Sequence, residues 1–394
     1  MATRQAVVLG ARFGGLAVVS WLRRVYSPRT LDIVVIDRWA ETIYRPGLVH
    51  AMTVEPLQVV PPVRMAMAAF WKRHHVQFIH DTIAGLDPQR RQIYTVSHPP
   101  ISYAVLFVAT GSDPGWDTVD GLGPHRGGIC EGYLARQTAS NLRPRRLRRM
   151  VFAVGMIHGN PAWTPPISVG CECPLLESAL LWENRLRRSG LREDADIVVL
   201  TPAATIAENA GPQAQQWLRQ ALSRRGIQVI TGASFKKVTD SEVILADRRI
   251  PYDGALWIPP YIGASWLRGS AIEDGYGWIP TDSYLNHPDY PDIYAVGDVA
   301  SHPWPKMGHS AMVQARIAVR HWHAVQTRRP LPMPYQPQLL WIMETGGGGG
   351  LFVQSDVFYG GTREIVHSGY WPWAAKQVFQ KTYVSLRGAL PLMP

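Results

Sequence analysis

Short apolar runs alternate with segments of helical periodicity along most of the chain. An apolar run at residues 5–9 precedes a glycine-rich turn at residues 10–15, a helix predicted over residues 16–26 and a second apolar run at residues 31–36. Continuous hydrophobicity is typical of strands that are buried on both faces. The order therefore predicts a βαβ unit, with two parallel strands connected by a helix.

The same alternation returns twice further along the chain. A second set of apolar runs and helical segments begins with MVFAVG after Arg149 and extends to residue 245, and a third unit follows IYAVGDVA, with a helix predicted over residues 310–325. In the second set we expect helices at residues 175–188 and 212–225, and strands at residues 196–200, 228–230 and 242–245. Five consecutive glycines, Gly346 to Gly350, then predict a turn between two strands.

This order predicts an α/β fold with two Rossmann-like, three-layer dinucleotide-binding domains and a carboxy-terminal capping or membrane-contact region. We expect residues 1–112 and the return segment 290–325 to form one FAD-binding domain. Residues 113–289 form the second domain, and residues 326–394 form a region for capping, dimer formation or membrane contact.

Composition narrows the choice of partners. The chain of 394 residues has 40 basic and 30 acidic residues, a net charge of +10 that favours anionic lipid or acidic partners. No nucleic-acid-binding motif accompanies this charge. Fifteen tryptophans suit either a membrane edge or a packed core. Without a signal pattern or an apolar run of about 20 residues, we expect a cytoplasmic protein, peripheral on a membrane.

The first glycine-rich turn carries the strongest chemical signal. Gly10, Gly14 and Gly15 permit a sharp turn and close approach of a pyrophosphate to a helix amino terminus. Asp37 ends the second strand, where a carboxylate can accept hydrogen bonds from ribose hydroxyls. The middle position of the usual G-x-G-x-x-G is Arg12, which predicts either crowding or neutralisation of the phosphates. The neighbouring candidates for cofactor contact are Phe13 and Arg38.

Two later stretches strengthen this interpretation. Ala109, Thr110 and Gly111 end the strand AVLFVATG, whereas Gly297 and Asp298 end DIYAVGD and are expected to open a helix. An aspartate there can accept hydrogen bonds from ribityl hydroxyls, and the helix dipole would stabilise negative charge on a reduced flavin.

Several further stretches accompany these motifs. They are YRPGL after Asp37, CECPLLESALL, TPAATIAENAG, GWIPTDSYL and PKMG. The chain resembles the sulfide:quinone oxidoreductase and flavocytochrome c sulfide dehydrogenase branch of the pyridine nucleotide-disulfide oxidoreductases, nearly end to end. The resemblance implies FAD as cofactor, a small sulfur substrate such as sulfide, a quinone or cytochrome as electron acceptor, and a membrane surface contacted by the carboxy-terminal region. Trp371, Trp373, Phe379 and Tyr383, with Lys376, Lys381 and Arg387, would dock that region on anionic lipid.

The resemblance also implies catalytic residues. Lys306 matches a lysine near the flavin pyrimidine, Cys173 a redox cysteine that faces the flavin, and Cys130 a further cysteine of the quinone-reducing branch. The partner cysteine expected in the last third of the family is absent, because no cysteine follows Cys173. Either Cys171 with Cys173, or Cys130 with Cys173, is left to replace it, and inert buried thiols are the alternative.

The second domain lacks the motif that an NADH-using relative requires. After its first strand comes GMIHGNP, with Pro161, Pro165 and Pro166 in place of a helix start. The histidine spacings predict no metal site. Two alternatives remain: a type II NADH:quinone dehydrogenase-like enzyme, and a flavoprotein subunit of an electron-transfer complex that has lost independent sulfide chemistry.

Overall fold

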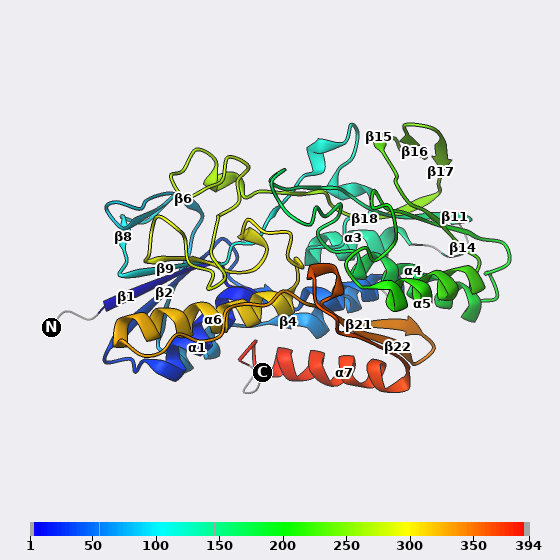
Figure 1. Cartoon of the computed structure of the whole chain (residues 1–394). Coiled ribbons are helices and arrows are strands. Elements are labelled where there is room, and N and C mark those ends of the chain that lie inside the picture. Colours follow the sequence, from blue (N-terminus) through cyan, green and yellow to red (C-terminus); the bar gives the residue numbers. More distant parts are fainter. Residues whose placement is uncertain (1–3, 55, 143, 145–146, 390–394) are drawn as a thin grey trace.

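The computed structural model describes residues 4–54, 56–142, 144 and 147–389. A five-stranded parallel sheet in the order β20-β9-β1-β2-β5 lies at the amino-terminal end of the molecule (Figure 1). Its strands are β1 (Arg4–Leu9), β2 (Leu31–Asp37), β5 (Val76–His80), β9 (Val105–Val108) and β20 (Ile293–Ala295). The return segment therefore completes the edge of the first sheet, where Tyr294 is in register with Phe107.

The two faces of this sheet are covered differently. Helices α1 (Phe13–Val25) and α6 (Gly308–Thr327) pack on one face, against Ala6 and Val8. The other face, with Val7 and Leu9, packs against long loops and the small antiparallel sheet of β6 (Ile83–Asp87), β7 (Gln92–Thr95) and β8 (Ile101–Ser102). Burial on both faces is the reason that the strands read as continuous apolar runs.

A second parallel sheet, in the order β14-β13-β11-β18, lies beside the first (Figure 1). Its strands are β11 (Arg149–Val154), β13 (Asp196–Leu200), β14 (Ile227–Ile230) and β18 (Gly254–Ile258), with helices α4 (Cys173–Arg188) and α5 (Pro212–Arg224). An antiparallel sheet of β15 (Phe235–Val238), β16 (Glu242–Leu245) and β17 (Arg249–Pro251) follows. The two-sheet α/β architecture is confirmed, whereas the domain boundaries at residues 112, 289 and 325 remain predictions.

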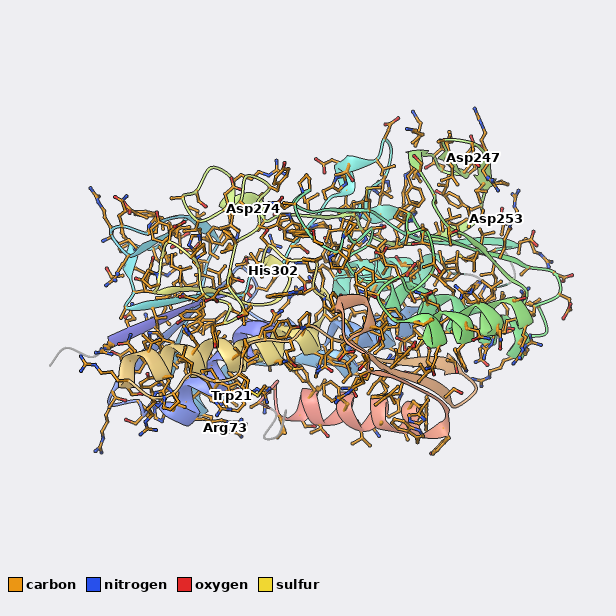
Figure 2. All side chains as sticks on the ribbon, viewed as in Figure 1. Trp21, Arg73, Asp247, Asp253, Asp274 and His302 are labelled. Carbon is orange, nitrogen blue, oxygen red and sulfur yellow. The ribbon has the colours of Figure 1, made fainter. Side chains whose placement is uncertain are left out.

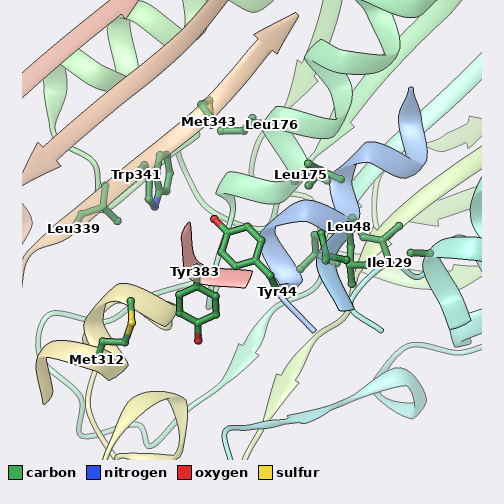
Figure 3. Packing of buried hydrophobic residues seen from close by; sticks show 14 of the residues in the cluster. Tyr44, Leu48, Ile129, Leu175, Leu176, Met312, Leu339, Trp341, Met343 and Tyr383 are labelled. Carbon is green, nitrogen blue, oxygen red and sulfur yellow. The ribbon is translucent and has the colours of Figure 1, made fainter. Parts of the chain in front are cut away.

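The carboxy-terminal region is an antiparallel sheet of β21 (Leu339–Gly346), β22 (Gly349–Ser355) and β23 (Glu364–Gly369), covered by helix α7 (Tyr370–Ser385). The glycine run forms the predicted turn, because β21 ends at Gly346 and β22 begins at Gly349. Figure 3 shows residues of this region, Trp341 and Met343, in one cluster with Leu175 and Leu176 of α4. The helix α3 (Gly132–Asn141) and short elements complete the fold. These are β3 (Thr42–Ile43), β4 (Arg64–Met65), β10 (Asp113–Pro114), β12 (Ile157–His158), β19 (Tyr261–Ile262), α2 (Ala68–Arg73) and eight 3-10 segments.

Candidate active site

The first glycine turn forms a cradle that only glycine can line. Gly10 has φ +98°, and a Cβ added at Gly15 would lie 1.8 Å from the carbonyl oxygen of Gly10. Helix α1 begins at Phe13, not at Leu16 as predicted, and its first bond runs from the Leu16 N–H to the Arg12 carbonyl. The preceding N–H groups therefore point out of the helix end, where they suit a pyrophosphate.

The strand ends beside the cradle supply further groups. Asp37 accepts hydrogen bonds from the backbone N–H groups of Ala11 (2.6 Å) and Trp39 (2.7 Å), so its carboxylate ties the turn to the end of β2. Arg38, next to it, is exposed. After β9, Thr110 accepts a hydrogen bond from the Trp266 indole at 3.3 Å. A ribose at this edge would meet a carboxylate that is already oriented by two amides.

The Arg12 side chain does not crowd the cradle, because an ion pair holds its guanidinium beside the turn. Its guanidinium donates two hydrogen bonds, of 2.9 and 2.7 Å, to the carboxylate of Glu131, which also accepts one of 2.5 Å from Arg45. Burial alone would raise the pKa of Glu131, but the charges of Arg45 and Arg12 outweigh it and lower that pKa to about 2. Two cations and one anion leave a net positive charge beside the cradle. The motifs had not indicated Glu131, which follows Cys130 in the sequence.

The turn after β20 lies beside the glycine cradle, since a Cβ added at Gly14 would be 3.2 Å from Val296. It differs from the prediction at Gly297 and Asp298. They lie in a 3-10 segment of three residues, and the next α-helix begins only at Gly308. The prediction that Asp298 opens a helix was wrong, because the two prolines of the intervening stretch, Pro303 and Pro305, cannot donate helical hydrogen bonds. Asp298 is half-buried, and burial raises its pKa although Lys306 and Arg45 act in the opposite direction.

All three cysteines lie in this region, and each is free. Burial raises the pKa of Cys130 to about 11 and that of Cys171 to about 12, and the negative charges of Asp298 and Cys130 raise the latter further. Cys173 is the first residue of α4, and its pKa is raised by burial and by the charges of Glu177 and Cys171. Cys171 thus shares its surroundings with Cys130 and Asp298, while Cys173 lies on the side of Glu177.

A buried charge network extends from Glu177 toward the carboxy-terminal region. Glu177 pairs with Lys376 of α7, both side chains being 3% exposed, and accepts a hydrogen bond of 2.9 Å from the backbone N–H of Glu344. The Glu344 carboxylate in turn contacts His50 at 2.8 Å and Gln377 at 3.0 Å. The network connects the surroundings of Cys173 to a partly exposed histidine.

This network corrects the predicted docking surface. Lys376 is buried against Glu177, and Tyr383 is 1% exposed, so neither side chain is available to lipid. Tyr383 instead packs on Phe13 and Tyr44, with ring centroids 4.9 and 5.4 Å apart (Figure 3). The inner face of α7 therefore packs on the carboxy-terminal sheet, and Tyr383 near its end packs against the start of α1. On its outer face Tyr370, Trp371 and Val378 are the exposed large hydrophobic residues.

The turn after β11 cannot serve as a second phosphate cradle of this kind. A Cβ at Gly155 would lie 2.3 Å from Pro260, and one at Gly159 would lie 2.3 Å from the Trp163 ring, so side chains fill the space beside both glycines. Helix α4 begins only at Cys173, with Pro174 at its start. At its amino terminus the buried Glu172 carboxylate accepts a hydrogen bond from the Ala207 N–H at 2.5 Å. The Glu172 carboxyl group thus stands at the start of α4 but bonds to Ala207 and makes no capping hydrogen bond to the helix.

Comparison with known proteins agrees with this arrangement. Residues 169–321 match the family described as pyridine nucleotide-disulphide oxidoreductase. The chain is 24% identical to the mitochondrial sulfide:quinone oxidoreductase of the mouse, over 80% of this chain and 70% of that protein, and 23% identical to a sulfide-quinone reductase of Aquifex aeolicus, over 97% and 90%. The crystal structure of the Aquifex aeolicus sulfide:quinone oxidoreductase superposes with a TM-score of 0.85 at 19% identity, covering 98% of this chain and 92% of that one.

The fold is that of the pyridine nucleotide-disulfide oxidoreductases. The resemblance predicted from the motifs is confirmed, and with it FAD as the cofactor of an FAD-dependent oxidoreductase. A type II NADH:quinone oxidoreductase of Mycobacterium tuberculosis also matches, 23% identical over 75% of this chain and 67% of that protein. None of the described helices is both long and apolar enough to cross a lipid bilayer.

Proposed function

We propose that the chain oxidises sulfide, or a related reduced sulfur compound, and delivers the electrons to a membrane quinone. The observation that carries this proposal is the placement of the thiols. Cys130 and Cys171 are free and partly buried, and both Cys130 and Asp298 raise the pKa of Cys171, so the three groups lie near one another. FAD, when bound, would accept and donate the electron pair.

The residues divide the work of holding FAD. Gly10, Gly14 and Gly15, with Phe13 and Arg12, would receive the pyrophosphate, and Asp37 the adenosine ribose. Asp298 would contact the ribityl chain, and Arg45 adds positive charge beside the cradle. Contacts to the first half of the cofactor extend to Arg38, Ala109, Thr110 and Gly111.

The overall reaction balances without another reactant. Hydrogen sulfide gives up two electrons and two protons and becomes zero-valent sulfur, while a quinone gains two electrons and two protons and becomes a hydroquinone. Two titratable pairs, Glu177 with Lys376 and Glu344 with His50, lie next to one another and can bind and release protons, and His50 of the second pair is partly exposed. The protonated thiols need a nearby cation to react as thiolates. Burial raises the pKa of Cys130 to about 11, and Arg45 and Arg12 act in the opposite direction.

We assign lipid contact to the outer face of α7. Tyr370, Trp371 and Val378 are 69%, 48% and 64% exposed, and Lys381 is exposed beside them. Replacing Trp371 and Val378 by alanine should weaken binding to vesicles that contain phosphatidylglycerol by about tenfold without lowering the melting temperature, because little buried area is lost. A matched control replaces the exposed Val96, which lies on the first domain. Unchanged vesicle binding of the double variant would remove the assignment.

Anaerobic flavin spectroscopy tests the reaction. We expect a yellow protein whose flavin absorption bleaches on addition of sulfide and recovers on addition of a quinone analogue, and whose bleaching is slowed at least a hundredfold by Cys171→Ser. Bleaching by NADH and not by sulfide would overturn the proposal in favour of an NADH dehydrogenase. An electron-transfer subunit without sulfur chemistry is the second candidate, favoured by the lack of any cysteine after Cys173. It predicts bleaching by neither reductant.

A further inference from the structure

Lys306 is a buried cation without a carboxylate partner. Its side chain is 4% exposed, and within the described part of the chain no carboxylate oxygen lies within 4.0 Å of its Nζ atom. The ammonium group donates instead to the backbone carbonyls of Asp298 at 3.1 Å and Ala300 at 2.7 Å. A lysine has three N–H donors. Two are directed at backbone oxygens, and the third has no oxygen acceptor among the hydrogen bonds of the described residues.

Two tryptophan rings complete the surroundings of this ammonium. Nζ lies 4.9 Å from the ring centroid of Trp163 and 4.8 Å from that of Trp278. The two rings are 5.4 Å apart at an interplanar angle of 64°, so they contact the cation from two directions. An indole face attracts a cation, and most strongly where water is excluded. Trp278 is fully buried and Trp163 is 9% exposed.

Hydrogen bonds fix both rings in place. The Trp278 indole donates to the His158 carbonyl at 3.1 Å, and the Trp163 indole donates to the Ser301 hydroxyl at 3.0 Å. Ser301 and Asn160 both bond to the carboxylate of Asp274. Figure 2 labels Asp274 and His302 in this part of the molecule. The rings thus come from two separate loops, one after β12 and one after β19.

We propose that Trp163 and Trp278 are positioning residues that hold the Lys306 ammonium charged and aimed past Asp298 at the electron-accepting end of bound FAD. A cation there stabilises the reduced, anionic cofactor over the oxidised one and raises its reduction potential. This inference rests on the proposed placement of FAD between the glycine cradle and Asp298. It assigns a function to two of the fifteen tryptophans and to the proline-interrupted loop after β12.

The charges around Lys306 determine the pH dependence. Burial lowers the pKa of Lys306 to about 8, although Asp298 and Asp274 act to raise it. His302, which is stacked on Trp304, is neutral at pH 7 because burial and the charge of Lys306 lower its pKa to about 4. The cation is therefore mostly present at pH 7 and is lost as the pH rises through 8. Removing an indole face destabilises only the charged form, so the loss should then occur at lower pH.

Reduction potentials of the holoenzyme test the proposal. Trp278→Leu and Trp163→Leu should each weaken the preference for reduced FAD by about three- to tenfold at pH 7, about 15–30 mV for a two-electron couple. Trp278→Phe should give an intermediate value, and Trp257→Phe, at a buried indole of β18, should give none. In a Lys306→Met background the tryptophan substitutions should have no further effect, because the cation is gone. Two results would overturn the proposal. One is an unchanged reduction potential in both leucine variants, and the other is an undiminished effect of the tryptophan substitutions on the potential when Lys306 is methionine.

Nitrogen NMR of lysine-labelled protein provides an independent measurement that needs no FAD. The Nζ resonance that disappears in Lys306→Met should titrate near pH 8 in the wild type and at lower pH in Trp278→Phe. An unchanged titration midpoint of Lys306 in Trp278→Phe would contradict the proposed contact between the two indole rings and the ammonium. If the wild-type protein takes up no FAD but shows these titrations, the proposed function fails, whereas the stabilisation of the Lys306 ammonium by the two tryptophans is supported.

Discussion

The two parallel sheets of this protein begin in the same way and diverge at the first turn. After β1, the residues Gly10, Ala11 and Arg12 suffice to reach α1, and the glycines leave a space bounded by backbone. After β11, residues 155–172 intervene before α4, and Pro260 and Trp163 fill the space beside the glycines. Sheet topology alone therefore does not make a dinucleotide site; the turn and the start of the helix do.

The same contrast extends to charge. The end of α1 is bordered by Arg12 and Arg45, which outnumber Glu131, whereas the end of α4 holds the buried Glu172. The two arginines beside α1 attract a pyrophosphate, whereas Glu172 offers no positive charge at the end of α4. The stretch between β11 and α4 carries Trp163 and Cys171 instead, and Cys173 is the first residue of α4.

Closing the first cradle should produce the largest effect. Gly15→Ala would place a methyl group 1.8 Å from the Gly10 carbonyl, so we expect protein purified without bound FAD. Gly14→Ala meets Ala109 and Val296 at 3.2 Å, and should weaken FAD binding by only about tenfold. Gly85→Ala, which meets nothing within 4 Å, is the control. Flavin content, with circular dichroism to verify folding, measures the series. Full flavin content in Gly15→Ala would refute the placement of the cofactor.

Local pattern was sufficient to predict most of the secondary structure. The strand at residues 196–200 coincides with β13, and the helix at residues 212–225 ends one residue later than α5. These elements are buried on a regular period, so their hydrophobicity identifies them without knowledge of their neighbours. The helix expected at Asp298 was wrong, because the pattern of the following segment did not weigh its prolines enough.

Pairings between distant segments could not be predicted in this way. Lys376 reads as a lipid-facing lysine among aromatic residues, yet its partner Glu177 lies 199 positions earlier. Glu131 likewise matters because it binds Arg12, and Trp278 because it contacts Lys306. No spacing rule connects either pair. Such contacts depend on the packing of whole domains. The motifs therefore named the glycine turn and the cysteines as candidates, whereas the charged groups beside them required the structure.

The acid at the start of α4 should produce the next largest effect. Burial raises the pKa of Glu172 from its ordinary 4.5 to about 7, so the folded state binds its proton more tightly than the unfolded state. Stability is therefore lost as the pH rises from about 4.5 to 7. Glu172→Gln, which keeps an acceptor for the Ala207 N–H, should be more stable than the wild type by roughly 3 kcal/mol above pH 7 and equal to it near pH 4. Urea unfolding at both pH values measures the difference, with the exposed Glu193→Gln as the control.

The acid at the first cradle should show the opposite sign and a smaller effect. Arg45 and Arg12 lower the pKa of Glu131 to about 2 against the influence of burial, so its stabilising contribution is present above pH 4.5 and is lost as the pH falls toward 2. Because the side chain is 20% exposed, we expect Glu131→Gln to lower the free energy of unfolding by about 2 kcal/mol at pH 7. The free energies of unfolding of the wild type and of Glu131→Gln, measured by urea unfolding at several pH values, should become equal as the pH falls toward 2. A variant as stable as the wild type at pH 7 would mean that the two arginines are held by other groups, and that the contrast between the helix ends lies in the backbone turn alone.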